Sequence, residues 1–223
     1  MESYRKHCLK QQTELRRILT SYQQHERALE LFMSQHAFLH SAKMAASVEW
    51  SFEDEVLDDL SDEQFRHIPP NGEHSVAWCI WHIARIEDIT MNMLVAGAPQ
   101  LLGQDDWYKR LNASARDTGN AMSMEEIAEV SAELDLEALR AYRLAVGRRT
   151  RQIVGALMVE DIKRKVNPAD LEQALAVGAV APEAQGLIDY WGKRDIAGLM
   201  LMPATRHNLV HLNEALQIKA KSR

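Results

Sequence analysis

The stretch RHNLVHLNEA, residues 206–215, places His207 and His211 four residues apart in a segment with helical character. Residues three and four apart share one face of a helix. At ~100° per residue, the residues on the face of His207 are Ile196, Met200, Pro203, Ala204, His211, Glu214 and Ile218. On this face the apolar residues Ile196 and Met200 are therefore followed by His207, His211 and Glu214. Burying three polar side chains costs on the order of several kcal/mol unless each finds a partner, so we expect something to satisfy them.

A second segment repeats this anomaly. Residues 75–97 read SVAWCIWHIARIEDITMNMLVAG, and Ser75 is a plausible N-cap for a helix that ends at Gly97-Ala98-Pro99. His82 lies mid-helix, on a face shared with Trp78, Cys79, Ile86, Ile89 and Met93. Three histidines on the core faces of two helices predict one shared site.

A divalent metal would explain all three histidines together. Neutral imidazoles are good ligands for zinc, nickel, copper or iron, and a pair at i, i+4 can bind one ion from one face. Three protein nitrogens leave a position open for water or substrate, as in catalytic zinc sites. We therefore predict His82, His207 and His211 as ligands, with Glu214 as a fourth ligand or as a residue that orients an imidazole. The alternative is that each buried histidine hydrogen-bonds a carbonyl or a carboxylate.

Another pair, His36 and His40, has the same spacing in QHAFLH. The periodicity predicts one helical segment over residues 34–60, whose apolar face contains Phe38, Ala42, Ala45, Phe52 and Val56. His40 lies nearly opposite that face, so we expect this pair to face solvent or to lie under the N-terminal extension, and not to bind the metal. Glu49 falls on the apolar face, where it would reach the metal site or form an ion pair with Arg85.

The rest of the chain predicts an all-α protein, a four-helix bundle with an extra N-terminal helix and helical insertions. Breakers in HIPPNGEHS, residues 67–75, separate the first two long helices. Residues 100–122 read as a loop with one short turn, and a third helix starts at Met124 or Leu134 and runs through Leu157. Shorter helices follow over 159–181, and the last helical region spans 182–219 with a break at Gly192. No alternating strand pattern is present.

The composition of the chain argues against nucleic acid and membranes as binding partners. The 223 residues carry a formal net charge of −6, which offers no electrostatic footprint for nucleic acid or an anionic membrane. Cys8 and Cys79 suggest neither a disulfide framework nor a thiolate metal site. With no signal peptide and no run of ~20 apolar residues, we expect a cytoplasmic protein.

These segments resemble a known family. LSDEQFRHIPP (60–70), HSVAWCIWHIARIED (74–88) and ATRHNLVHLNEA (204–215) are similar to the DinB-like metal-binding four-helix-bundle superfamily. Its members carry W-x-x-x-H-I/L-x-x-x-E in the second helix, matched by His82 and Glu87, and H-x-x-x-H near the end of the fourth, matched by His207 and His211. Glu214 stands where many relatives have Gln. The resemblance covers residues 34–219, which leaves 1–33 as an N-terminal helical extension.

The resemblance implies a homodimer-prone bundle that holds Zn²⁺ or Ni²⁺, or alternatively Fe or Mn, on three histidines. Characterised relatives include thiol-dependent S-transferases and isomerases that use bacterial low-molecular-weight thiols. We therefore expect a metal-dependent enzyme acting on a small molecule, in which the cation activates a thiol. Glu214 would support the site, and Arg85 would contact an acidic thiol cofactor. The alternatives are a metal-dependent hydrolase with Glu214 as general base, and a non-catalytic metal-binding or stress-response bundle whose fourth protein ligand closes the coordination sphere.

Overall fold

The computed structural model describes residues 2–44, 50–70, 72 and 74–222, and its regular elements there are helical. A single isolated β-bridge joins Lys165 and Asp195 in that part of the chain. The prediction of an all-α protein is confirmed. The elements are α1 (Glu2–Ile18), η1 (Tyr22–Gln24), α2 (His25–Phe38), η2 (Ala42–Met44), α3 (Phe52–Leu57), α4 (Asp62–Arg66), α5 (Val76–Asp88), η3 (Ile89–Val95), η4 (Leu101–Gly103), α6 (Trp107–Arg110), α7 (Met124–Glu133), α8 (Leu136–Gly155), α9 (Val159–Lys163), α10 (Pro168–Ala176), η5 (Pro182–Ala184), α11 (Gln185–Gly192), α12 (Ile196–Leu201), η6 (Met202–Arg206) and α13 (His207–Lys221).

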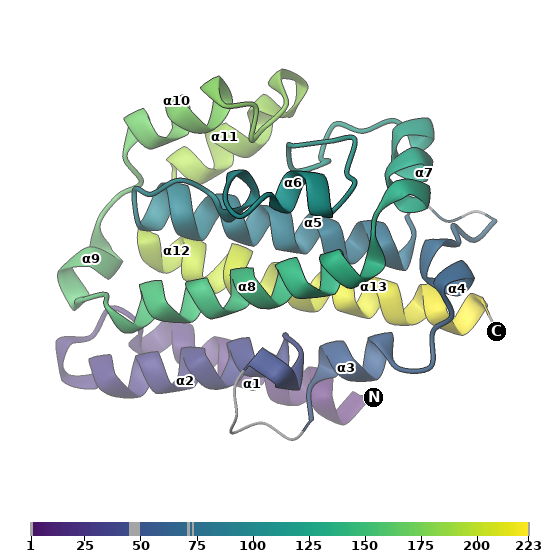
Figure 1. The fold of residues 1–223 in the computed structure, drawn as a ribbon. Coiled ribbons are helices and arrows are strands. Elements are labelled where there is room, and N and C mark those ends of the chain that lie inside the picture. The colour runs from purple at the N-terminus through teal and green to yellow at the C-terminus, as the bar shows by residue number, and fades with distance from the viewer. Residues whose placement is uncertain (1, 45–49, 71, 73, 223) are drawn as a thin grey trace.

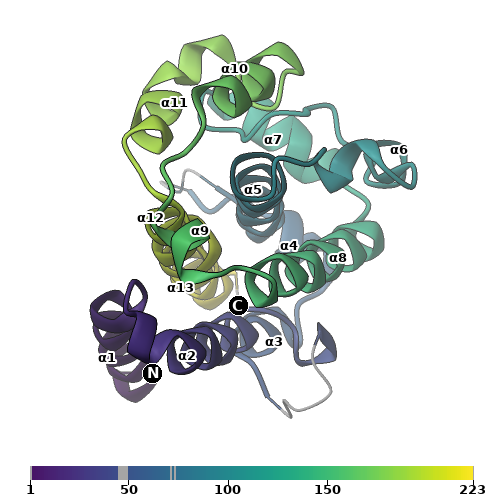
Figure 2. The ribbon, with the colours of Figure 1, turned by 90° about the vertical axis from the view of Figure 1, so that its left-hand side faces the viewer.

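The centre of the fold is a four-helix bundle made by α2, α5, α8 and the continuous rod α12–η6–α13 (Figure 1). Seen along the bundle, α1 lies outside, against α2, and α10 and α11 lie beyond α5 (Figure 2). Apolar side chains of these helices fill the interior in two clusters, one around α5 and α8 and the other around α12 and the N-terminal helices. No helix in the described part of the chain is long and apolar enough to cross a bilayer.

Local sequence explains where α5 begins and ends. The hydroxyl of Ser75 accepts a hydrogen bond from the Trp78 backbone N–H at 2.9 Å, which confirms Ser75 as the N-cap. The helix continues as the π-helix η3, and Gly97 follows it with a positive φ of 60°. Glycine adopts this left-handed conformation without steric cost, which suits the end of a helix.

The structure divides one predicted helix and fixes where another begins. The continuous segment predicted over 34–60 is wrong, because α2 ends at Phe38 and a new helix, α3, starts behind Ser51, whose hydroxyl accepts from the Asp54 N–H at 3.0 Å. The third helix was predicted to start at Met124 or Leu134, and the structure agrees with the later start. Asp135 caps α8 by accepting from the Ala138 N–H at 2.8 Å, and α7 is a separate helix that ends at Glu133. Glu49 lies outside the described residues.

The N-terminal segment shares the core of the bundle. Leu15, Ile18 and Phe32 belong to the same cluster of buried apolar side chains as Met200 of α12. The predicted boundary between residues 33 and 34 falls inside α2. The division into an N-terminal extension and a bundle domain stays a prediction. The apolar core is continuous across the boundary between residues 33 and 34.

A π-helix precedes the two histidines of α13. η6 contains Pro203, and a π turn is wider than an α turn because its hydrogen bonds span five residues instead of four. The buried stripe therefore continues from Ala204 to Asn208 and Leu212. His207 and His211, predicted to interrupt this stripe, lie at its edge and are half-buried.

Candidate metal centre

The three predicted ligands meet between α5 and α13. The ring centroids of His82 and His207 are 5.0 Å apart, those of His82 and His211 are 4.7 Å apart, and those of His207 and His211 are 4.6 Å apart. One possible ligand atom from each ring lies within 4.8 Å of the other two. His82 is 2% exposed, whereas the two histidines of α13 are partly open to solvent. The cluster is thus closed on the α5 side and reachable from the α13 side.

Hydrogen bonds fix the orientation of two of the rings. Nδ1 of His82 donates to the carbonyl oxygen of Thr118 at 2.5 Å, and Nδ1 of His211 donates to Oε2 of Glu214 at 2.8 Å. A proton on Nδ1 leaves Nε2 with its lone pair in the neutral ring. Such outer partners are typical of imidazoles that bind metal ions. Nδ1 of His207 is buried and has no hydrogen-bond partner in the described part of the chain. The donor set therefore fits a divalent ion that prefers nitrogen.

Burial favours the neutral form of His82 and His207. It lowers the pKa of His82 from 6.5 to about 3, and the neighbouring His211 acts in the same direction. It also lowers the pKa of His207 well below its ordinary value, with His82 and His211 adding to the effect. A metal ligand must present a free lone pair, so neutral imidazoles at neutral pH are ready to coordinate.

Glu214 supports this cluster from behind His211. Its second carboxylate oxygen, Oε1, accepts a hydrogen bond from Nδ1 of His74 at 2.6 Å. Burial raises the pKa of Glu214, but the hydrogen bonds from His211 and His74 outweigh it and lower the pKa from 4.5 to about 2. Glu214 groups with His211 and Cys79 as a set of possible ligands, and the set formed by the three histidines does not include it. The Cys79 thiol is buried, and burial together with Glu214 raises its pKa well above 9.0.

Residues that sequence reasoning missed complete the surroundings. His74 stacks on Trp78 with centroids 3.8 Å apart, and Trp78 stacks on His82 at 4.5 Å. The spacing of four residues between His74 and Trp78 could have indicated this contact. However, His74 precedes the N-cap Ser75, so helical periodicity does not apply to it. Thr118 lies in a loop with no pattern that links it to His82.

Arg85 takes part in a separate buried network. Its guanidinium donates to Tyr142 Oη at 2.7 Å, to Gln100 Oε1 at 2.5 Å and to the carbonyl oxygen of Arg116 at 2.7 Å, and it forms an ion pair with Asp88 at 3.2 Å. These contacts anchor the loop whose Thr118 carbonyl holds His82. A role for Arg85 toward a thiol cofactor stays a prediction.

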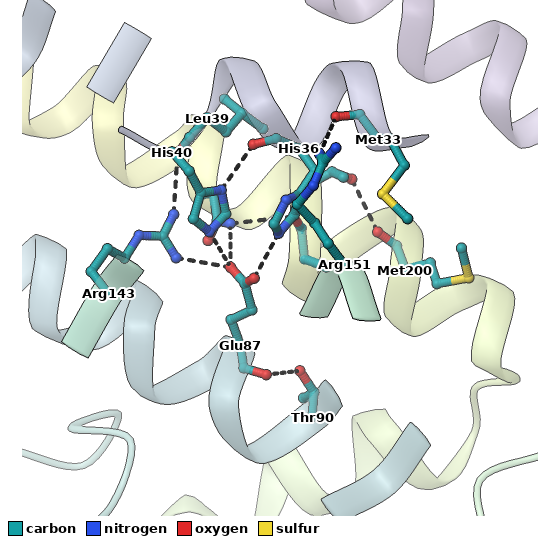
Figure 3. Close-up of polar contacts among 12 residues, drawn as sticks. Met33, His36, Leu39, His40, Glu87, Thr90, Arg143, Arg151 and Met200 are labelled. Carbon is teal, nitrogen blue, oxygen red and sulfur yellow. Dashed lines mark hydrogen bonds and ion pairs between the residues drawn. The ribbon is translucent and has the colours of Figure 1, made fainter. Parts of the chain in front are cut away.

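A second cluster involves His36 and His40, which were expected to face solvent or to lie under the N-terminal extension. The expectation that they face solvent is wrong, because both are fully buried. Nε2 of His36 lies 2.8 Å from Oε1 of Glu87, and Nε2 of His40 lies 3.0 Å from Oε2 of the same carboxylate (Figure 3). Because α2 ends at Phe38, the face deduced from a helix through Phe52 does not apply to it. These histidines form a group separate from the triad.

Arg143 and Asn208 complete the second cluster. An amino group of Arg143 and the amide of Asn208 each donate to Oε2 of Glu87 at 2.8 Å. Nε of Arg143 also donates to Oε2 of Glu53 at 3.0 Å. Burial alone would raise the pKa of Glu87. The nearby His40, His36 and Arg143 together outweigh burial, so the pKa of Glu87 lies well below 4.5. Glu87 is therefore a buried carboxylate with four nitrogen neighbours.

Comparison with known proteins places this architecture in a family. A crystal structure of a conserved protein from Enterococcus faecalis is similar to the chain, with a TM-score of 0.60 and 16% identity over 86% of this chain and 95% of that one. At this identity the likeness concerns the fold. No curated protein matches the chain. The model of the DinB superfamily matches residues 50–214, a span that includes all three histidines of the candidate metal centre. The chain belongs to the DinB superfamily.

Proposed function

We propose that the protein is a metal-dependent enzyme that transfers or rearranges groups on small molecules with the help of a low-molecular-weight thiol. One observation carries the proposal. Three imidazoles converge at a position that is partly open to solvent, and the described residues that form this ligand group are the three histidines alone. His82, His207 and His211 would hold a divalent ion such as Zn²⁺ or Ni²⁺. When bound there, the ion supplies Lewis acidity that lowers the pKa of a thiol at the open position.

The protein's own residues prepare this site. Thr118 and Glu214 hold the rings of His82 and His211 with their Nδ1 protons engaged. Trp78 covers one face of His82 and keeps water from it. Glu214 fixes the orientation of the His211 ring, and His74 holds the other oxygen of that carboxylate in place.

The position of Glu214 bears on the two alternatives. As a general base for hydrolysis it would start from a pKa of about 2 and would first have to release two hydrogen bonds. A base of that strength takes few protons from water near neutral pH. As a fourth ligand that closes the site it would have to leave both histidines. Its contacts therefore support an orienting role, which leaves the coordination sphere open to a substrate.

A thiol-binding experiment tests the proposal. Protein loaded with Co²⁺ is titrated with glutathione, cysteine and bacillithiol, and the sulfur-to-cobalt charge-transfer absorption is recorded. We expect a saturable band for the wild type and none for His211→Ala. Because Cys79 is the nearest protein thiol, Cys79→Ser serves as the control and should keep the band. Absence of the band with all three thiols would refute thiol activation, while retained cobalt would still support the metal site.

A conversion assay then addresses chemistry. The zinc-loaded protein is incubated with an electrophile such as 1-chloro-2,4-dinitrobenzene, with and without each thiol. We expect turnover above the uncatalysed rate that requires both metal and thiol. A hydrolase would instead turn over an ester substrate without any thiol, and a non-catalytic bundle would do neither.

A further inference from the structure

We propose that His36, His40 and Glu87 form a second divalent-cation site, buried in the bundle and distinct from the histidine triad. This site goes beyond the proposed function and does not depend on it. Two imidazoles and one carboxylate are a donor set used by Zn²⁺, Fe²⁺ and Mn²⁺. Their ligand atoms lie within 4.8 Å of one another in the described structure. His36 belongs to α2, His40 to the turn that follows it, and Glu87 to α5.

The two imidazoles are held side by side and aim at the same carboxylate. Their ring centroids are 3.9 Å apart with an interplanar angle of 29°, and Nε2 of each ring faces a different oxygen of Glu87 (Figure 3). Gly147 on α8 leaves room for this arrangement. A Cβ at that position would lie 2.6 Å from Cδ2 and 3.1 Å from Nε2 of His40. Rings that converge in this way already have the relation that two ligands of one ion require.

The hydrogen-bonding pattern of His40 requires a positive charge between it and Glu87. Nδ1 of His40 lies 2.9 Å from the carbonyl oxygen of His36, which can only accept, so Nδ1 carries a proton. Nε2 of a neutral His40 is then a lone pair, and it faces the carboxylate oxygen at 3.0 Å. Two acceptors do not stabilise each other, and a cation bound to both removes the conflict.

Charge in the cluster points the same way. Glu53 and Glu87 are two buried carboxylates, and Arg143 is the cation that contacts both. Buried charges are stable when they are paired or coordinate a metal. A divalent ion bound by Glu87 would place a second centre of positive charge beside these two carboxylates. Asn208 adds a further polar atom, because its amide oxygen is buried and has no hydrogen-bond partner in the described part of the chain.

Complete burial gives the site a distinctive behaviour. Both histidines and Glu87 have side-chain exposures of 0–1%, whereas the triad includes the half-buried His207 and His211. A chelator should therefore strip the triad from the native protein, while an ion held by His36, His40 and Glu87 should leave only when the bundle unfolds. The two sites define two separable pools of metal.

The experiment measures these pools. Wild-type protein without a histidine tag is refolded in excess Zn²⁺ and dialysed against EDTA, then unfolded in guanidinium chloride with EDTA, and zinc is counted after each step. We expect about one zinc per chain to leave the native protein and about one more to leave on unfolding. Zinc that leaves entirely before unfolding would overturn the proposal, and would mean that a proton rather than a metal joins His40 to Glu87.

Variants assign each pool to its ligands. His40→Gln and His36→Gln should each lose the zinc that resists EDTA and keep the labile zinc. His211→Ala should lose the labile zinc and keep the resistant one, so failure of the triad is told apart from failure of this site. His25→Gln is the matched control, because His25 lies on the same helix α2 and bonds the Leu157 carbonyl at 3.0 Å, away from both clusters. Resistant zinc that survives in folded His40→Gln and His36→Gln would refute the assignment. If neither variant folds, the wild-type count decides.

Discussion

The side-chain amide of Asn208 donates a hydrogen bond to Oε2 of Glu87 at 2.8 Å. It therefore joins the residue next to His207 to the carboxylate that lies between His36 and His40. Both residues are fully buried, on α13 and α5 respectively. This contact ties the two helices that carry the histidine triad, so the second cluster helps to set the spacing of the first.

Replacing Asn208 tests this link. Asn208→Asp puts a second carboxylate against Glu87 in a dry environment, and we expect the free energy of unfolding to fall by about 3–5 kcal/mol. Asn208→Ala removes one donor, and we expect a loss of about 1–3 kcal/mol. Urea unfolding followed by circular dichroism measures both. With EDTA present during unfolding and refolding, an aspartate variant as stable as the alanine variant would contradict a close contact between residue 208 and an ionised Glu87.

Gly147 tests the packing of His40. A Cβ at Gly147 would lie 2.5 Å from Met44 Sδ and 2.6 Å from His40 Cδ2, so Gly147→Ala should destabilise the protein by about 1–3 kcal/mol through overpacking. Gly155 on the same helix is the matched control, because its Cβ would meet only Met33 Cε at 3.8 Å. We expect Gly155→Ala to be neutral or slightly stabilising, since alanine favours helices. Equal losses for the two variants in thermal melts would contradict the described contact.

The stability of the chelated protein should fall in mild acid. Burial lowers the pKa of His82 from 6.5 to about 3 in the folded state. Between these two pH values the unfolded chain therefore binds a proton at His82 and the folded chain does not. Its contribution is therefore fully present above pH 6.5, falls as the pH drops below 6.5, and is completely lost below about pH 3. One such group gives a slope of at most about 1.4 kcal/mol per pH unit. Unfolding free energies of wild type and His82→Gln between pH 7 and 4 measure it, and a wild-type slope no steeper than that of the variant would contradict the assignment.

Metal removal should leave the bundle folded. Apolar burial across two large clusters offsets the entropy of the chain without help from an ion, unlike in a zinc finger. We expect EDTA-treated wild type and His211→Ala to keep their helical circular dichroism and to melt earlier, with a loss of about 2–4 kcal/mol for the labile ion. Collapse of the helical signal at room temperature in either sample would favour a structural metal over a catalytic one.

Sequence periodicity was sufficient to find the triad. His82 lies in the middle of an uninterrupted helix with a clear N-cap at Ser75, so its face could be deduced from Trp78 and Ile86. His207 and His211 share one helix, so their spacing alone brought them together. The sequence overestimated their burial, because no residue pattern predicted the π-helix η6. This π-helix shifts the helical phase, so Asn208 lies in the buried stripe instead.

The second cluster could not be deduced in this way. The phase assigned to His36 and His40 depended on Phe52, which belongs to another helix, and no local pattern showed that α2 ends at Phe38. Glu87 meets these histidines, and Arg143 meets the carbonyl of the neighbouring Leu39, through tertiary packing between segments about 50–100 residues apart. Contacts between such distant segments depend on how the helices pack together, and they cannot be deduced from the periodicity of a single sequence.

Anomalous X-ray diffraction tests the central claim most directly. Crystals of tag-free protein grown with Zn²⁺ are measured at energies on either side of the zinc edge. We expect a peak within about 2.1 Å of one ring nitrogen each of His82, His207 and His211, with Glu214 still bonded to His211 and the fourth position taken by water or a thiol. A peak bound directly by Glu214 with no open position, or no peak between α5 and α13, would contradict this claim.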